Sequence, residues 1–261
     1  MSSEPVVVRA DDDLATCAGH FVRMGVRHLP VVSADGALAG VLTDANLFRH
    51  GALIGGDRAW MPREPEQDLR AGAICDPAEI VVGPDVGLET VLRRLARTRQ
   101  DFAVVAEGAH TIGIVTEHDT LKIALDLLPV PTLATDVGVT DVVTVGSDET
   151  VGSALARMEE HHIRHLVATD AEGVVCGVVS LGDLRAEPSE QTTIATLIHD
   201  RPPFVTTADA TLRDVARGML ERNLGCVPVV RPDRRVVAIV TRRDVMEAAV
   251  GALEDEGLFE G

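Results

Sequence analysis

Four short stretches of the sequence place a hydroxyl side chain three positions before a residue with a side-chain oxygen. They are Thr43 to Asn46, Thr116 to Asp119, Ser180 to Asp183 and Thr241 to Asp244. A carboxylate just past a strand can accept two hydrogen bonds from the cis-diol of a ribose, and a hydroxyl beside the first amides of a helix can contact a phosphate oxygen. The same spacing is typical of a helix cap, in which each side chain bonds to the other residue's backbone. The two roles are compatible, so both interpretations stay open.

The first and fourth stretches depart from the other two in ways that bear on binding. Asn46 is neutral and has a single acceptor oxygen beside a donor group, so we expect diol binding there to be weaker or absent. Ala238 stands in the fourth stretch where the others have glycine, and its methyl group could crowd the adjoining cleft.

Two Arg-His pairs offer cations for a phosphate. Arg27-His28 and Arg164-His165 come just before apolar strands, and the corresponding places in the other copies hold Gln100-Asp101 and Gly225-Cys226. The planar fork of arginine fits phosphate oxygens, and histidine adds a charge that depends on pH. The alternative is that these cations stabilise the C-terminus of a helix, an effect of about 0.3–1 kcal/mol. A further arginine group beside the fourth stretch could aid a polyphosphate or form plain surface: Arg231, Arg234, Arg235, Arg242 and Arg243.

The elements that position these residues repeat four times. An apolar strand precedes each hydroxyl stretch, and its second residue lies 13 positions before the hydroxyl in every copy. Upstream, apolar residues recur at i, i+3, i+4 and i+7, which predicts a one-faced amphipathic helix. These sets begin at Leu14, Leu88, Val151 and Leu212, each three residues after an aspartate that suits the helix dipole. Each copy therefore predicts a short extended segment, helix, strand, turn, strand and helix, which is an α/β (α+β) unit.

This order of elements, with the phrase Gly-x-x-Thr/Ser-x-x-Asp/Asn after a Leu-Pro-Val-Val-like strand, resembles the CBS domain, named after cystathionine β-synthase. The resemblance covers four repeats, at residues 1–50, 72–127, 136–187 and 193–250. A unit of about 60 residues is marginal alone, so pairing is expected. The resemblance implies two Bateman modules packed as a flat pseudo-symmetric disc, similar to the γ subunit of AMP-activated protein kinase. Residues 51–71 would form a connector, with Trp60 packing it against the rest of the chain. Residues 251–261 would form an acidic tail.

The resemblance also implies a ligand: AMP, ADP, ATP or S-adenosylmethionine, bound in clefts between paired repeats. In the family's pattern the ribose would contact Asp119, Asp183, Asp244 and, less well, Asn46. The phosphate would contact Thr43, Thr116, Ser180, Thr241, Arg27, His28, Arg164 and His165. The chain is thus expected to be a stand-alone regulatory sensor, monomeric or homodimeric. It would need no cofactor and would report the ligand level to a protein partner that the sequence does not identify.

Two other functions stay open. A scaffold whose clefts have lost their ligands is favoured by Asn46 and by the two repeats without a basic pair. An enzyme that uses the nucleotide as its substrate is less favoured, because no known nucleophile or phosphate-loop motif occurs and no catalytic residue is predicted. The cluster His161, His162 and His165 does not have the spacing of a zinc site, so no metal is predicted.

Composition limits the partners and the location. The 41 acidic and 24 basic residues give a net charge of −17, which opposes binding to nucleic acid or anionic lipid. With five Phe, one Trp and no Tyr, the chain has few aromatic platforms for bases. Four widely spaced cysteines predict reduced thiols. No secretory signal or bilayer-spanning apolar stretch is visible, so we expect a cytoplasmic protein.

Overall fold

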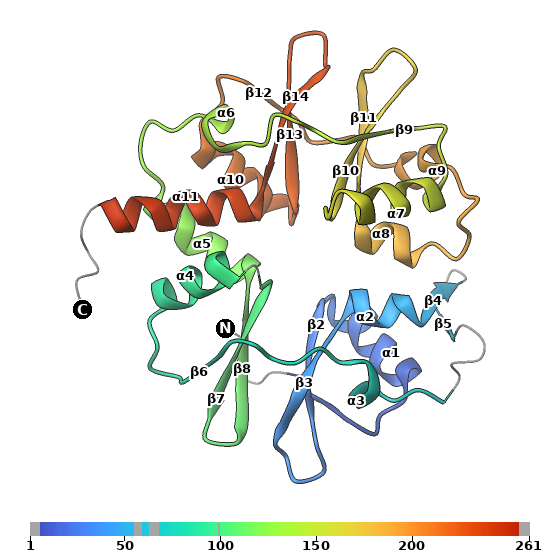
Figure 1. Ribbon diagram of the computed structural model, residues 1–261, viewed down its shortest axis with the longest axis vertical. Coiled ribbons are helices and arrows are strands. Elements are labelled where there is room, and N and C mark those ends of the chain that lie inside the picture. Colours follow the sequence, from blue (N-terminus) through green and yellow to red (C-terminus); the bar gives the residue numbers. More distant parts are fainter. Residues whose placement is uncertain (1–5, 55–58, 63–67, 99, 256–261) are drawn as a thin grey trace. The chain divides into compact units, whose positions relative to one another are not determined.

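Four sheets of three strands follow one pattern in the computed structural model, which describes residues 6–54, 59–62, 68–98 and 100–255 (Figure 1). In each, a short first strand is parallel to a central second strand, which pairs antiparallel with the third. The first strands are β1 (Val8–Arg9), β6 (Val81–Val82), β9 (Thr144–Gly146) and β12 (Thr206–Thr207). The second strands are β2 (His28–Val32), β7 (Phe102–Glu107), β10 (His165–Thr169) and β13 (Cys226–Val230). The third strands are β3 (Leu38–Thr43), β8 (His110–Thr116), β11 (Val175–Ser180) and β14 (Val236–Thr241).

The register of the antiparallel pairs places the start of each second strand opposite the hydroxyl residue that ends the third. The facing pairs are His28 and Thr43, Phe102 and Thr116, His165 and Ser180, and Cys226 and Thr241. Each pair also has one register shift toward the turn. The strands predicted from the equal spacing are therefore confirmed.

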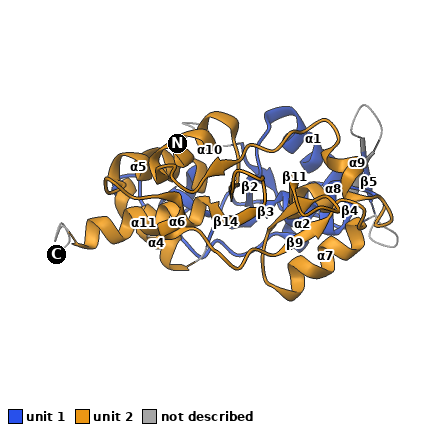
Figure 2. Cartoon of the chain, turned by 90° about the horizontal axis from the view of Figure 1, so that it is seen from above, with its two compact units in different colours: residues 1–87, 100–116, 185–188 blue, residues 88–99, 117–184, 189–261 orange. Residues whose placement is uncertain are grey.

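The chain forms two compact units (Figure 2). Unit 1 contains residues 1–87, 100–116 and 185–188, and unit 2 contains residues 88–99, 117–184 and 189–261. Unit 1 thus includes the sheets of repeats 1 and 2. Unit 2 includes the long helices of repeat 2 and nearly all of repeats 3 and 4.

The predicted amphipathic helices are α1 (Leu14–Met24), α4 (Leu88–Thr98), α7 (Val151–Glu160) and α10 (Leu212–Arg222). Their apolar faces are buried, except that Leu88 is 43% exposed and Leu155 is partly buried. In three of them the cap is the residue directly before the helix, not the aspartate two positions earlier. Asp13, Thr150 and Thr211 each accept a hydrogen bond from the amide three residues on. The predicted acidic starts at Asp11, Asp148 and Asp209 therefore lie outside the helices.

A second helix begins immediately after each hydroxyl residue: α2 (Asp44–Arg49), α5 (Glu117–Leu127), α8 (Leu181–Ala186) and α11 (Arg242–Asp255). In unit 2, α4 and α5 of repeat 2 pack against α10 and α11 of repeat 4 around one hydrophobic core. Thr120 is fully buried in this layer, and its hydroxyl lies 3.2 Å from Sδ of Met246.

Three short helices lie in the segments that precede repeats 2, 3 and 4, which we call lead segments (residues 71–80, 134–143 and 194–205). They are α3 (Ala71–Ile74), α6 (Ala134–Val137) and α9 (Ile194–Ile198).

Each lead segment contacts the third strand of another repeat. Asp76 exchanges two backbone hydrogen bonds with Val41 of repeat 1, at 2.9 and 3.0 Å, and Val139 exchanges two with Ile239 of repeat 4, both at 2.9 Å. Ile198 of α9 packs closely on Gly177 of β11 in repeat 3. Repeat 1 is therefore paired with repeat 2, and repeat 3 with repeat 4, as the two predicted modules require.

The sheets make the same pairings. Val41 of repeat 1 packs against Phe102 and Val104 of repeat 2. Val167 of repeat 3 packs in one buried cluster with Cys226 of repeat 4.

Part of the predicted connector is regular structure. β4 (Gly51–Ile54) and β5 (Ala59–Pro62) form an antiparallel hairpin, and Trp60 packs against the core that contains α1. Residues 55–58 and 63–67 of the connector, and 256–261 of the predicted tail, lie outside the described residues. The tail's first residues, up to Asp255, continue α11. All four cysteines are free thiols, and none of the described helices is long and apolar enough to cross a bilayer.

Candidate ligand-binding site

Each predicted hydroxyl and oxygen pair lies where a third strand meets a helix, and we call these pairs junctions 1 to 4 in chain order. At junction 4, the amide and the hydroxyl of Thr241 both donate to Oδ2 of Asp244, at 2.6 and 2.8 Å. At junction 3, the amide of Ser180 donates to Oδ2 of Asp183 at 2.9 Å, and the Ser180 hydroxyl lies 2.5 Å from the same oxygen. The capping role is thus present, and it uses only one oxygen of each carboxylate.

The second carboxylate oxygen at junction 4 is not used by the cap. Among the described residues, Oδ1 of Asp244 receives no hydrogen bond. Burial raises the pKa of Asp244, against the hydrogen bonds from Thr241 and the nearby charge of Arg243. Junction 4 therefore presents a half-buried carboxylate with one oxygen fixed and the other able to accept hydrogen bonds.

At junction 3 the second oxygen has a partner from a lead segment. Nη1 of Arg201 donates to Oδ1 of Asp183 at 3.0 Å, and the Arg201 side chain is 73% exposed. The carboxylates of junctions 3 and 4 both influence one buried thiol: burial raises the pKa of Cys226 to about 12, and the charges of Asp244 and Asp183 add to that effect. The carboxylates of Asp183 and Asp244 therefore both contribute negative charge at the start of β13, where Cys226 lies.

Junction 1 is closed by the chain itself. Asn46 is only 1% exposed; its Oδ1 accepts from the Thr43 amide at 2.9 Å, and its Nδ2 donates to Oδ2 of Asp76 at 2.9 Å. The nearby cation is also engaged, because Nε of Arg27 donates to Oδ2 of Asp44 at 2.7 Å. The amide side chain of Asn46 and the guanidinium of Arg27 are thus both engaged within the chain.

At junction 2, Thr116 ends β8 and Asp119 lies in the first turn of α5, and both are half-buried.

The histidines of the two basic pairs occupy equivalent places. Each stands opposite the hydroxyl of its own junction and touches the partner repeat at the start of its second strand. The His28 ring lies 5.1 Å from that of Phe102, centroid to centroid, and a Cβ at position 225 would collide with Nε2 of His165. The carbonyl of Arg164 accepts a hydrogen bond from Leu181 at 2.8 Å, so its backbone is tied to the start of α8.

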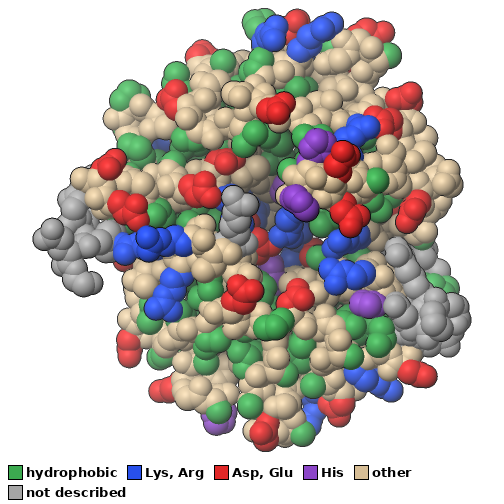
Figure 3. All heavy atoms as spheres, viewed as in Figure 1, with side chains coloured by type: hydrophobic (Ala, Val, Ile, Leu, Met, Phe, Trp, Pro, Cys, Tyr) green, Lys and Arg blue, Asp and Glu red, His purple; other side chains and the backbone are tan. Residues whose placement is uncertain are grey.

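Four of the five arginines grouped beside junction 4 divide into two kinds, and the fifth, Arg243, is half-buried. Arg231, Arg234 and Arg235 are exposed in the turn between β13 and β14, as expected of surface residues. Arg242 is only 9% exposed, so the surface interpretation is wrong for it. Its Nε donates to the Leu224 carbonyl and its Nη2 to Oδ1 of Asn223, both at 2.8 Å, which ties α11 to the end of α10. On the face in Figure 3, acidic side chains are scattered among basic ones.

The Ala238 methyl group is accommodated. Ala238 is fully buried, and the facing residue on the lead segment is Gly138, where an added Cβ would lie 3.3 Å from that of Ala238. Repeat 1 has the reverse arrangement, because a Cβ on Gly40 would lie 2.6 Å from the Asp76 carbonyl oxygen. In repeat 1 the glycine of this contact is on the third strand, whereas in repeat 4 it is on the lead segment that packs against the third strand.

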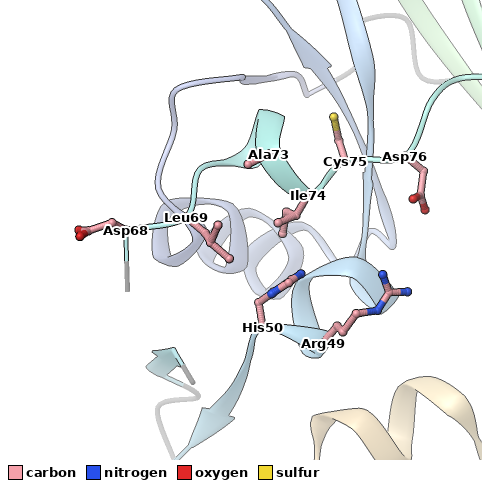
Figure 4. A pocket seen from close by; sticks show the side chains of 8 residues that line it. All are labelled: Arg49, His50, Asp68, Leu69, Ala73, Ile74, Cys75 and Asp76. Carbon is pink, nitrogen blue, oxygen red and sulfur yellow. The ribbon is translucent and has the colours of Figure 1, made fainter. Parts of the chain in front are cut away.

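A separate hollow of about 640 Å³ lies in unit 1 between α2 and the lead segment of repeat 2 (Figure 4). Arg49 at the end of α2 and the following His50 lie on one side of it, and the Ile74 side chain points toward them from the other side. Its lining is Arg49, His50, Asp68, Leu69, Ala73, Ile74, Cys75 and Asp76, which includes none of the residues predicted from the sequence.

Sequence reasoning missed two residues that contact the junctions, Asp76 and Arg201. Both belong to lead segments, which precede one repeat but pack on another, so spacing within a repeat gives no sign of them. A usable signal is that each lies five positions before the first strand of its own repeat.

Comparison with known proteins agrees with this architecture. The family model of the CBS domain matches residues 1–52, 71–126, 134–190 and 195–251. Protein MJ1225 of Methanocaldococcus jannaschii, proposed to be an archaeal homologue of g-AMPK, is 16% identical with a TM-score of 0.76, over 95% of this chain and 96% of its own. An uncharacterised conserved protein of Pyrococcus horikoshii is 18% identical with a TM-score of 0.65, over 95% and 97%. At these identities the two structures support the fold alone.

Among curated proteins, the uncharacterised protein MJ1404 of M. jannaschii is 26% identical over 178 residues. The match covers 61% of this chain and 42% of that relative, so the chain spans less than half of its length.

Proposed function

Because the chain belongs to the CBS domain family and holds four copies of the domain, we propose that it is a regulatory sensor that binds an adenosyl ligand, with junction 4 as the principal site. One observation carries this choice: Oδ1 of Asp244 accepts no hydrogen bond from the described residues. At junctions 1 and 3 the corresponding atoms are bonded to Asp76 and Arg201.

The chemistry of junction 4 suits a ribose. A carboxylate oxygen has two lone pairs and can accept one hydrogen bond from each hydroxyl of a cis-diol. Hydrogen bonds to a charged acceptor are stronger than neutral ones, and partial burial of Asp244 adds to their strength. Thr241 holds the other oxygen, so the carboxylate is oriented before the ligand arrives. A phosphate on the sugar would then lie near the first amides of α11, which has 14 residues.

Apolar side chains for the adenine ring lie at the contact between repeats 3 and 4. Val178, Val205 and Val236 are partly buried there and pack against a core of Val167, Val175, Cys226, Val230 and Ile239. Val139 of the lead segment is 49% exposed beside Ile239. These residues offer an aliphatic surface without an aromatic platform.

Binding at this place would act on the pairing of repeats 3 and 4, because each contributes its lead segment to the other. A ligand that favours one arrangement of the pair shifts that equilibrium, and a partner that prefers the same arrangement feels a coupling of typically about 1–3 kcal/mol. The proposed output is therefore the affinity for a protein partner.

The test is a thermal-melt and calorimetric panel with AMP, ADP, ATP and S-adenosylmethionine. A ligand at 100 times its Kd stabilises the chain by about 2.7 kcal/mol, and we expect Asp244→Ala to abolish most of that gain. Asp214→Ala is a control, because the Thr211 hydroxyl donates to the Asp214 carboxylate at 2.7 Å and accepts from the Asp214 amide at 3.1 Å, a similar cap at the start of α10. Both variants lose a cap, but only Asp244→Ala should lose most of the ligand-induced stabilisation, which comes from junction 4.

The opposing results are equally specific. A wild-type chain that none of the four compounds stabilises, or an Asp244→Ala chain that binds as the wild type does, contradicts the proposal. The first result would favour an interaction scaffold, which the closed state of junction 1 already favours for repeat 1. The proposal also expects the ligand to be recovered unchanged by chromatography, and a product would indicate an enzyme.

A further inference from the structure

Each lead segment brings one side chain to the junction of the paired repeat. It lies five residues before the first strand, and the residues there are Asp76, Val139 and Arg201. Asp76 bonds Asn46 of junction 1, and Arg201 bonds Asp183 of junction 3. The backbone pairing of Val139 with Ile239 matches that of Asp76 with Val41, which places Val139 toward junction 4. Asp76 and Val139 thus pair alike with a third strand, and Arg201 lies equally far before the first strand of its own repeat, so the three lead segments supply an anion, a neutral side chain and a cation.

The anion at junction 1 excludes an anionic ligand. Asp76 is fixed by two backbone hydrogen bonds to Val41. Its carboxylate accepts the hydrogen bond from Nδ2 of the buried Asn46, so this donor group is already engaged within the chain. A phosphate there would meet the Asp76 carboxylate and an arginine, Arg27, that is already paired with Asp44.

The cation at junction 3 has the opposite effect. A ribose can reach Asp183 only through Oδ1, because Oδ2 belongs to the cap, and Oδ1 is the atom that Arg201 contacts. The ion pair is exposed, and such pairs hold weakly, so a diol can displace the guanidinium. The displaced guanidinium stays tethered beside the sugar, where its planar fork fits a phosphate. A ligand with a sulfonium would place a second positive charge beside it.

We propose that the lead-segment side chain at each junction sets the charge of the ligand there, and that Arg201 makes junction 3 a site for phosphorylated adenosine and not for a sulfonium compound. The inference rests on the proposed function, since it concerns the same class of ligand. It goes further by naming the residue that discriminates within that class.

The test compares the affinity for ADP, adenosine and S-adenosylmethionine by calorimetry, in chains that carry Asp244→Ala so that junction 4 does not contribute. Arg201→Val copies the residue at position 139. We expect this substitution to lower the affinity for ADP about tenfold, which corresponds to the loss of one charged hydrogen bond. The affinity for adenosine should stay within about twofold of its former value. S-adenosylmethionine should bind no more weakly than before. Arg217→Val is the matched control, because Arg217 is an exposed arginine paired with Asp214 on α10, and it should change none of the three.

A second comparison assigns the effect to junction 3. In a chain that also carries Asp183→Ala, Arg201→Val should have no further effect on ADP. Three results would overturn this inference and leave the proposed function standing. Arg201→Val could lower the affinities for ADP and adenosine equally, it could leave the affinity for ADP unchanged, or its effect could persist in the chain without Asp183. A wild-type chain that binds no adenosyl compound overturns both.

Discussion

Asn46→Asp is the substitution that most directly probes how junction 1 is closed. It changes one atom of the side chain, and it makes junction 1 identical in residue type to junctions 2 and 4. The hydrogen bond from the Thr43 amide to the side-chain oxygen can persist. The donor to Asp76 is replaced by an acceptor, so two carboxyl groups would face each other across 2.9 Å in a site where Asn46 is 1% exposed.

The expected cost follows from that distance. Two ionised carboxylates 2.9 Å apart repel by about 6 kcal/mol at an effective dielectric constant of 20. The pair avoids part of this by keeping a proton, which raises the pKa of one carboxyl above its ordinary value. Loss of the hydrogen bond to a charged group costs about 1.5–3 kcal/mol. We therefore expect a loss of about 2–4 kcal/mol in the free energy of unfolding at pH 7.

The assay is urea unfolding of the wild type and the variant at pH 7 and pH 5. A carboxyl with a raised pKa in the folded state binds more protons folded than unfolded, so the variant should recover stability as the pH falls. The double variant Asn46→Asp/Asp76→Asn restores one donor and one acceptor with their places exchanged, and should return to within about 1 kcal/mol of the wild type. A single variant as stable as the wild type at pH 7, or a double variant no better than the single, refutes the reasoning.

Three further substitutions test other contacts. Gly40→Ala should lower the free energy of unfolding by about 1–3 kcal/mol, because the added Cβ would meet the backbone oxygen of Asp76. Gly83→Ala is the control, because no atom lies near its added Cβ, and it should not lower the free energy of unfolding. Denaturant titration compares the two variants, and equal stabilities would contradict this prediction. Burial raises the pKa of Glu149, but its hydrogen bonds and the Arg157 charge outweigh this and hold the pKa at about 2, so stability should fall between about pH 4.5 and 2. Glu149→Gln should flatten that part of the pH profile, and an unchanged profile would refute the assignment. Burial and nearby positive charges lower the pKa of His118, so the wild type should lose stability from pH 7 to 5, and His118→Gln should lose less; equal losses would contradict this.

The sequence predicted the part of the fold that is local. The spacing from each second strand to its hydroxyl residue is constant because both belong to one hairpin, whose register is fixed by neighbouring residues. Leu212 and its helix could be found because the apolar period of a helix repeats within eleven residues. The capping pair at Ser180 and Asp183 could be predicted for the same reason.

What the sequence left out depends on residues distant along the chain. Arg201 and Asp76 reach junctions of repeats other than their own, and no periodicity relates them to Asp183 or Asn46. Arginine usually lies at the surface, and nothing in the local sequence marks Arg242 as an exception. It is buried because two residues that follow α10 offer its guanidinium a carbonyl oxygen and a side-chain amide oxygen. Tertiary contacts, not local pattern, decide these cases.

The most direct measurement is a crystal structure of the chain grown with millimolar ADP. We predict electron density for the ribose with both hydroxyls within hydrogen-bonding distance of Oδ1 of Asp244, while Asn46 and Asp76 stay bonded to each other. Density for water alone beside Asp244, or a nucleotide seated against Asn46, would contradict the account.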